Sequence, residues 1–222
     1  MARLDEALAA LEEKGEARIR DGLARYGIAT ADRVIGVPMA GIQTVGKAFR
    51  HDHDLAAALW ETGLYEARML AAYVDDPALV TPGQMDRWAR DFDNWGTCDT
   101  LCFVLFDRTE SRFDMVDRWA GDPAEFVRRA AFALLASIAL HDKKSGDEPF
   151  LARLPLIEGA AADGRNFVKK GVSWALRTIG GRKSETLQAA ARELGERLAA
   201  STDKSERWVG KDALKAFDKK KG

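Results

Sequence analysis

Residues 167–176 read FVKKGVSWAL, and the design of this stretch recurs along the chain. An aromatic residue opens it, a cation stands three positions later, and apolar residues stand eight and nine positions after the aromatic. The opening aromatic recurs at intervals of 30, 31, 41 and 41 residues, at Tyr65, Trp95, Phe126, Phe167 and Trp208. A regular period of this length is typical of stacked helical repeats. The sequence therefore predicts an all-α repeat protein.

Three rows of side chains follow from this register. With each aromatic as position 0 and a turn of about 100° per residue, positions +8 and +9 fall on the helix face that packs on neighbouring helices. Position +3 lies about 60° from the aromatic row and is basic in most repeats, so we expect it to face an acidic partner. The predicted core rows are Tyr73, Phe103, Leu134, Ala175, Ala216 and Val74, Val104, Leu135, Leu176, Phe217, and the +3 row is Arg68, Cys98, Arg129, Lys170, Lys211.

Helix caps and breaks divide the chain into about six helix pairs without any strand. A polar connection at 145–148 lengthens one repeat. We expect a single domain spanning 1–222, with a flexible basic tail at 218–222. The predicted helices cover 3–24, 30–49, 54–61, 65–75, 83–91, 96–106, 111–120, 124–141, 148–160, 165–179, 184–200 and 204–217.

Composition narrows the class of protein. Hydrophobic residues make up 46% of 222 residues, and no stretch approaches the ~18 apolar residues of a membrane span. The charged start of the chain has no signal-peptide pattern, so we expect a cytoplasmic protein. The two cysteines, Cys98 and Cys102, stand one helical turn apart, which suits buried thiols in a reducing compartment better than a disulfide.

Charge is distributed unevenly along the chain. The net charge is −1, but residues 1–110 carry 12 Lys and Arg against 19 Asp and Glu, a formal charge of −7. Residues 111–222 carry 22 against 16, a formal charge of +6. The basic half suits a polyanionic partner such as nucleic acid. A charged, solvated surface of a repeat protein explains the same counts, so charge alone leaves both interpretations open.

One set of side chains combines chemistry suited to a damaged nucleic acid. Trp95 and Asp99 stand at positions 0 and +4 of one repeat, and Trp174 stands at +7 of a later one, where the neighbouring repeats have small residues. Stacking would bring these positions and Arg129 to one concave surface, the usual ligand face of a helical repeat protein. Two indoles, a carboxylate and cations suit a partner with flat rings, a positive centre and phosphates. Alkylated DNA has all three.

Three segments in the same order resemble the bacterial DNA alkylation repair family, the AlkD-like alkylpurine DNA glycosylases. They are the W-x-x-x-D of Trp95 and Asp99, the basic-A-A-hydrophobic run at Arg129–Phe132, and the F-V-K-K-x-V-x-W-A-L-R run at Phe167–Arg177. The resemblance covers roughly residues 25–217 and implies a right-handed α-solenoid of about six HEAT-like helix pairs with a concave ligand face. It also implies that Trp95, Asp99 and Trp174 line a lesion cleft and that Arg129 contacts phosphate. Asn94 stands where active members of the family tend to have a further Trp.

The resemblance implies an enzyme that hydrolyses the N-glycosidic bond of 3-methyladenine or 7-methylguanine in duplex DNA, without flipping the base into a pocket. Such bases are already cationic, so the enzyme needs chiefly to stabilise the developing sugar cation. Asp99 is the predicted catalytic carboxylate, which would also position water, and Trp95 and Trp174 would hold the base or sugar. We expect a monomer that acts on alkylated duplex DNA with no cofactor, metal, membrane or obligate protein partner.

Further cations are candidates for DNA contact, and other classes of function remain open. Lys170, Lys211 and Arg68 belong to the +3 row, and Lys143 and Lys144 follow a long apolar helix beside a loop, where helix-dipole chemistry explains them equally well. The run His51–Asp54 resembles metal ligands, but Asp54 is the expected N-cap of a helix. The alternatives to a glycosylase are a non-catalytic binder of branched or damaged nucleic acid and a protein-interaction scaffold.

Overall fold

The structure, a computed structural model, describes residues 2–219 and divides into two compact units, 1–110 and 111–222. Within residues 2–219 the regular structure is helical, and strand-like pairing is limited to an isolated bridge between Arg33 and Leu64. The predicted all-α class is confirmed. The unit boundary falls where the charge of the sequence changes sign. None of the described helices has the length and apolar character needed to cross a membrane.

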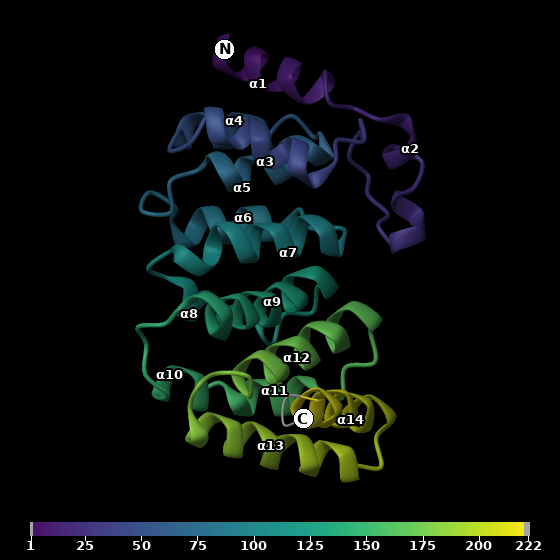
Figure 1. The fold of residues 1–222 in the computed structure, drawn as a ribbon, viewed down its shortest axis with the longest axis vertical. Helices are drawn as coiled ribbons and strands as arrows, with labels where there is room; N and C mark the ends of the chain where they lie inside the picture. Colours follow the sequence, from purple (N-terminus) through teal and green to yellow (C-terminus); the bar gives the residue numbers. More distant parts are fainter. Residues whose placement is uncertain (1, 220–222) are drawn as a thin grey trace. The chain divides into compact units, whose positions relative to one another are not determined.

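The first unit is built on short helices that pack against one another (Figure 1). α5 contacts α3, α4 and α7. Trp60 and Trp88 stack with ring centroids 4.4 Å apart and planes 5° from parallel, so α4 is joined to α6 by apolar contact. The elements are α1 (Ala2–Glu12), α2 (Ala17–Arg20), η1 (Leu23–Tyr26), α3 (Met39–Ala48), α4 (His53–Trp60), α5 (Tyr65–Val74), α6 (Pro82–Arg90), α7 (Trp95–Val104) and η2 (Phe106–Arg108).

The second unit centres on α12 packed along α9, with α13 and α14 forming a second close pair (Figure 1). Gly210 permits the latter contact, because a Cβ there would lie 2.3 Å from the Ala199 nitrogen and 2.6 Å from the Gly195 oxygen. The elements are α8 (Arg112–Trp119), α9 (Glu125–His141), α10 (Glu148–Leu151), α11 (Leu154–Ala160), α12 (Asn166–Ile179), α13 (Glu185–Ala200) and α14 (Lys204–Lys219).

Two long helices predicted near the start of the chain are wrong. The segment 3–24 breaks after Glu12 into α1, α2 and η1, and the segment 30–49 becomes helical only at Met39. For the second segment the reason lies in Glu66, a buried carboxylate of α5 that accepts hydrogen bonds from the backbone N–H groups of residues 35, 36 and 37. These donors are satisfied by a side chain from a distant helix, so the segment before α3 has no need of helical bonds.

Smaller corrections concern the core rows, one helix and one cap. Phe103, Tyr73 and Ala216 of the +8 row are exposed or half-buried, and Val104 of the +9 row is half-buried, so the two rows are buried only in part. The predicted helix 148–160 is divided between α10 and α11. Asp52, rather than Asp54, caps α4, because its side chain accepts from the Leu55 N–H at 3.0 Å. The predicted flexible tail begins inside α14, and 220–222 lie outside the described residues.

Candidate functional site

The start of α7 is fixed by Asn94. Asn94 is 1% exposed, and its side-chain oxygen accepts from the Thr97 N–H at 3.0 Å, which makes it the N-cap of the helix. Gly96 follows, and a Cβ there would lie 2.5 Å from the Tyr65 hydroxyl. A small residue is therefore required for α7 to approach α5, and these contacts set the direction in which Trp95 projects.

Trp95 is half-buried and is held by the segment that precedes α3. Its indole N–H donates to the Tyr26 carbonyl oxygen at 3.0 Å. A second contact lies two residues earlier in the chain, where Asp93 accepts from the Ala31 N–H at 2.6 Å. Residues 26–31, which we term the strap, are thus joined to the start of α7 at two points. The strap fixes the orientation of the indole and leaves part of the ring exposed.

Asp99 lies one turn after Trp95 on α7 and is half-buried, so the two side chains share a partly exposed helix face, as the spacing predicts. Cys98 and Cys102 on the same helix are both fully buried, as predicted. Burial, then Cys98, then the charges of Asp99 and Asp107 raise the pKa of the Cys102 thiol well above its ordinary value. The thiol therefore stays protonated and serves as a small core residue rather than a nucleophile.

The two arginines of the +3 row lie inside their units. Arg68 places its guanidinium 5.0 Å from the Trp60 ring centroid and pairs with Asp32 at 3.1 Å. Arg129 is 6% exposed and donates to the Phe167 carbonyl oxygen at 2.7 Å, near the start of α12. These guanidinium groups stabilise helix packing, and nothing in this geometry supports the predicted phosphate contacts of Arg68 and Arg129.

The lysines of the +3 row differ from the arginines. Lys170 and Lys211 are exposed, on α12 and α14, and neither forms an ion pair with a described residue. Lys169, the residue before Lys170, lies 4.9 Å from the ring centroid of Trp208, an indole that is 38% exposed. The row predicted from the sequence thus changes from internal arginines to exposed lysines along the chain, and only the lysines are available to an external anion.

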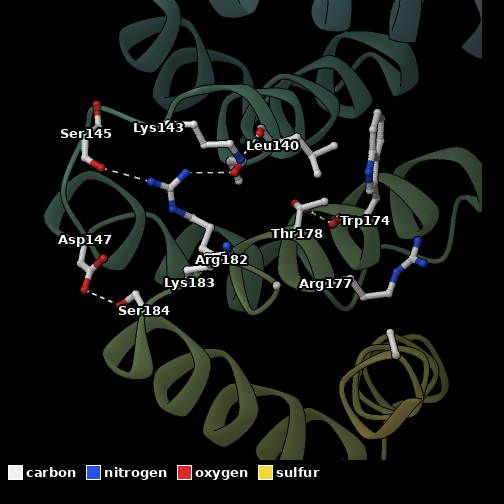
Figure 2. A pocket seen from close by; sticks show the side chains of 13 residues that line it. Leu140, Lys143, Ser145, Asp147, Trp174, Arg177, Thr178, Arg182, Lys183 and Ser184 are labelled. Atoms are coloured by element: carbon white, nitrogen blue, oxygen red, sulfur yellow. Dashed lines mark hydrogen bonds between the residues drawn. The ribbon is translucent and has the colours of Figure 1, made fainter. Parts of the chain in front are cut away.

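A pocket of about 800 Å³ opens beside Trp174 within the second unit (Figure 2). Residues from the end of α9, the last turns of α12 and the start of α13 line it, and Figure 2 shows the Trp174 ring standing at one end beside Leu140. Among the described residues the Trp174 indole N–H has no hydrogen-bond acceptor. Lys143 also lines the pocket, so the structure brings two of the predicted site residues together.

Arg182 holds the far side of the pocket in place. Its guanidinium donates to the carbonyl oxygens of Ala139, Asp142 and Ser145 at 2.9, 2.6 and 3.1 Å, and it lies 4.2 Å from the Phe150 ring centroid. These bonds join the end of α12 to the connection that lengthens this repeat. On the same wall, Ser184 donates to Asp147 at 2.6 Å. These hydrogen bonds, drawn as dashed lines in Figure 2, hold the side chains of this wall in place.

A turn supports this wall from behind. Asp142 is partly buried, which acts to raise its pKa, but hydrogen bonds from the Ser145 hydroxyl and N–H, the Lys144 N–H and the Arg112 guanidinium outweigh burial and lower the pKa below its ordinary value. The carboxylate therefore stays ionised and fixes the residues between α9 and α10. The Lys143 ammonium donates to the Leu140 carbonyl, while the Lys144 side chain is exposed.

The pocket contains cations that the sequence analysis did not select. The Arg177 side chain is 39% exposed and pairs with Asp212 at 3.3 Å, and Lys183 is exposed without an ion-pair partner among the described residues. The basic pair Arg182–Lys183 directly follows the break at Gly180–Gly181, which is the available sequence signal. Arg177 belongs to the run that carries the family resemblance. The sequence does not show that residues 139–147 pack against these cations.

Solved structures show a fold related to this one. A protein described as one of "a new family of proteins related to the HEAT-like repeat DNA glycosylases with affinity for branched DNA structures" matches with a TM-score of 0.78 and 16% identity, over 96% of this chain and 95% of the other. The structure of smu.31 from Streptococcus mutans UA159 matches with a TM-score of 0.57 and 20% identity, over 96% of each chain. At these identities the matches establish the HEAT-like repeat fold alone.

The sequence itself identifies the family. No significant match is found among curated proteins. The family profile described as "DNA alkylation repair enzyme", by contrast, matches residues 7–217, nearly the whole chain. This range includes the W-x-x-x-D of α7, the start of α9 and the F-V-K-K run of α12. The chain therefore belongs to the DNA alkylation repair enzyme family.

Proposed function

We propose that this protein is a DNA glycosylase that releases cationic alkylated purines, such as 3-methyladenine and 7-methylguanine, from duplex DNA. The observation that carries the proposal is the pair Trp95 and Asp99, one turn apart on a partly exposed face of α7, in a chain of the DNA alkylation repair family. Asp99 is the proposed catalytic carboxylate. Trp95 and Trp174 are the proposed aromatic contacts to DNA, with Trp95 beside the alkylated base or its sugar.

The reaction does not require protonation of the leaving base. Alkylation at N3 of adenine or N7 of guanine makes the base positive, so the glycosidic bond breaks without an acid that protonates the base. The positive charge then develops on the deoxyribose, where a carboxylate stabilises an oxocarbenium-like transition state and orients the attacking water. The electron pair of the broken bond leaves with the base, water supplies the new C–O bond, and its proton passes to solvent.

The indoles contribute binding rather than proton transfer. An aromatic face attracts a cationic base or the C–H groups of a sugar, with about 0.5–2 kcal/mol for a cation–π contact. The hydrogen bond from the Trp95 N–H to the Tyr26 carbonyl fixes its ring before substrate arrives, which lowers the entropic cost of binding. Exposed lysines, Lys170 and Lys211 among them, provide the phosphate contacts that any duplex DNA requires.

A second candidate is binding of branched DNA without catalysis. The observation that favours it is the structural match to a protein described by its affinity for branched DNA structures. The substitution of Asn94 for a family Trp also favours it, since Asn94 is committed to capping α7 and offers no ring to a substrate. Under this alternative, Asp99 is dispensable and the exposed cations carry the function.

The deciding experiment measures bases released from DNA. Methylated duplex DNA and uracil-containing duplex DNA are incubated with excess protein, and released bases are separated by liquid chromatography. We expect release of 7-methylguanine or 3-methyladenine and none of uracil, a neutral base that departs with difficulty. Efficient uracil release would contradict the mechanism. Absence of release from both substrates, together with tight binding of a four-way junction, would establish the second candidate instead.

A further inference from the structure

The pocket beside Trp174 has the size of a small-molecule site rather than of a duplex groove. Its volume of about 800 Å³ falls in the range of about 300–1,000 Å³ found for ligand pockets. Duplex DNA is wider than its own major groove, which is about 12 Å across, so it is too large for a pocket of this volume. A single nucleotide, detached from its pairing partner, fits.

The two ends of the pocket differ. The Trp174 indole and Leu140, a leucine that is 38% exposed, form an apolar surface at one end, where Arg177 also lies but is paired with Asp212 (Figure 2). Lys143, Arg182 and Lys183 lie toward the other end, and Asp147 is already bonded to Ser184. A nucleotide has the same division, since its flat base and its phosphate stand at opposite ends of the sugar.

The cations that line the pocket differ in the contacts that they already make. Arg182 is held by three carbonyl oxygens and fixes the wall, and Arg177 is paired with Asp212. Lys183 has no such commitment among the described residues, and the single contact of the Lys143 ammonium is to a carbonyl oxygen. These two lysines can therefore turn toward a phosphate without breaking an ion pair within residues 2–219.

The pocket offers little that would read the identity of a base. The Thr178 hydroxyl donates to the carbonyl oxygens of Trp174 and Ala175, both at 3.0 Å, and the Ser184 hydroxyl donates to Asp147. With these donors engaged, stacking on the indole is the main base contact, and stacking is tolerant of sequence. The pocket suits an unpaired nucleotide of any base.

We infer that this pocket binds one unpaired nucleotide of DNA, with the base stacked on Trp174 and the phosphate held by Lys143 and Lys183. The inference rests on the proposed binding of DNA, but not on base excision. It gives the protein a contact to DNA that has lost pairing, in addition to its contacts with duplex phosphates. Free nucleotides share the same chemistry, so the test includes them as a separate ligand.

The test compares binding of a labelled thymidine oligonucleotide of about ten residues with binding of a matched duplex, both by fluorescence anisotropy. Trp174→Ala should weaken binding of the single strand by about tenfold, and Trp174→Phe should restore most of it, because a ring remains. Trp208→Ala is the matched control, since Trp208 is a partly exposed indole of the same unit outside the pocket. It should change single-strand binding little.

A second pair of variants tests the phosphate contact. Lys183→Glu should weaken binding of the single strand severalfold more than Lys204→Glu, which makes the same charge change at an exposed lysine outside the pocket. Equal effects of the two variants, or an unchanged affinity in Trp174→Ala, would overturn the inference. Tighter binding of free deoxythymidine monophosphate than of the oligonucleotide, or a preference for the RNA of the same sequence, would overturn the assignment to DNA.

Failure of this inference is distinguishable from failure of the proposed function. If the parent releases methylated bases but the pocket variants bind the single strand normally, the pocket assignment alone is wrong. If the parent releases no base but single-strand binding depends on Trp174 and Lys183, the glycosylase proposal alone is wrong.

Discussion

The two units use their aromatic residues in different ways. In the first unit, which has a formal charge of −7, Trp95 is fixed by a hydrogen bond to the strap and stands beside a carboxylate. In the second unit, with a formal charge of +6, Trp174 has no acceptor among the described residues and stands at the end of a pocket rich in cations. The first arrangement suits chemistry on a cationic centre. The second suits the holding of a polyanion.

The arginines and lysines of the +3 row also differ in what they contact. Arg68 and Arg129 form the internal contacts that a planar guanidinium with several donors makes well, and the lysines at the same position are exposed. The residue type therefore distinguishes packing from binding better than position in the repeat does. The predictions below test these two comparisons, beginning with the effect that we expect to be largest.

The first prediction concerns the carboxylate of the first unit. Asp99→Asn should lower the rate of base release by about a hundredfold to a thousandfold, because the amide does not stabilise a sugar cation. Affinity for duplex DNA should remain close to that of the parent, since no phosphate contact is lost. Single-turnover release of 7-methylguanine and anisotropy on the same duplex measure the two quantities.

A structural role of Asp99 would give a different result. In that case Asp99→Asn would lower the free energy of unfolding by more than about 2 kcal/mol, and the loss of release would follow the loss of folded protein. Thermal denaturation of parent and variant separates the two explanations. A variant with the parent's stability and the parent's rate would contradict the assignment of Asp99 as the catalytic carboxylate.

The second prediction compares two cations of the second unit at the same register position. Arg129→Ala should lower the free energy of unfolding by about 3 kcal/mol, because it leaves a buried carbonyl without its charged donor and a cavity where the side chain packed. Lys170→Ala should change it by less than about 0.5 kcal/mol. Chemical denaturation measures both, and similar stabilities of the two variants would contradict the internal role of Arg129.

Much of the fold follows from local pattern. The predicted starts of α5, α6 and α7 at 65, 83 and 96 agree with the structure to within one residue, and α6 begins at Pro82 after a Thr81 cap. The helix predicted across residues 30–38 fails because Glu66, some thirty residues later, takes the backbone donors of this segment. A local pattern contains no information on such a contact.

In the candidate site, too, local spacing predicts some features and tertiary contacts decide others. Trp95 and Asp99 share a helix face because their spacing of four residues requires it, and the sequence alone predicts this. The burial of Arg129 depends on how α9 packs on α12, and the pocket depends on carbonyl oxygens about forty residues before Arg182. Spacing identifies neighbours within a helix, whereas tertiary contacts decide which cations remain exposed.

The third prediction concerns the turn behind the pocket. The pKa of Asp142 is lowered in the folded protein, so its contribution to stability is present at neutral pH and is lost as the pH falls below about 4, through the lowered pKa. Asp142→Asn should cost about 1–2 kcal/mol at pH 7 and progressively less in acid. Asp218→Asn, which breaks an exposed ion pair with Arg192, should cost less than about 1 kcal/mol. A difference between Asp142→Asn and the parent that is the same at pH 7 and pH 3 would contradict the ionised role.

The last prediction concerns the exposed lysines and has the smallest effect. Lys170→Ala and Lys211→Ala should each weaken binding of duplex DNA of any sequence severalfold, because each removes one phosphate contact. Each should also lower the steepness of the salt dependence by about one unit. Lys47→Ala, at an exposed lysine of α3 in the acidic unit, is the matched control and should change neither quantity. Affinity is measured by anisotropy over a series of salt concentrations.

Equal effects of all three variants would mean that the DNA-binding surface does not follow the difference in charge between the units. An unchanged affinity in Lys170→Ala and Lys211→Ala at low salt would mean that these lysines are only a solvated surface.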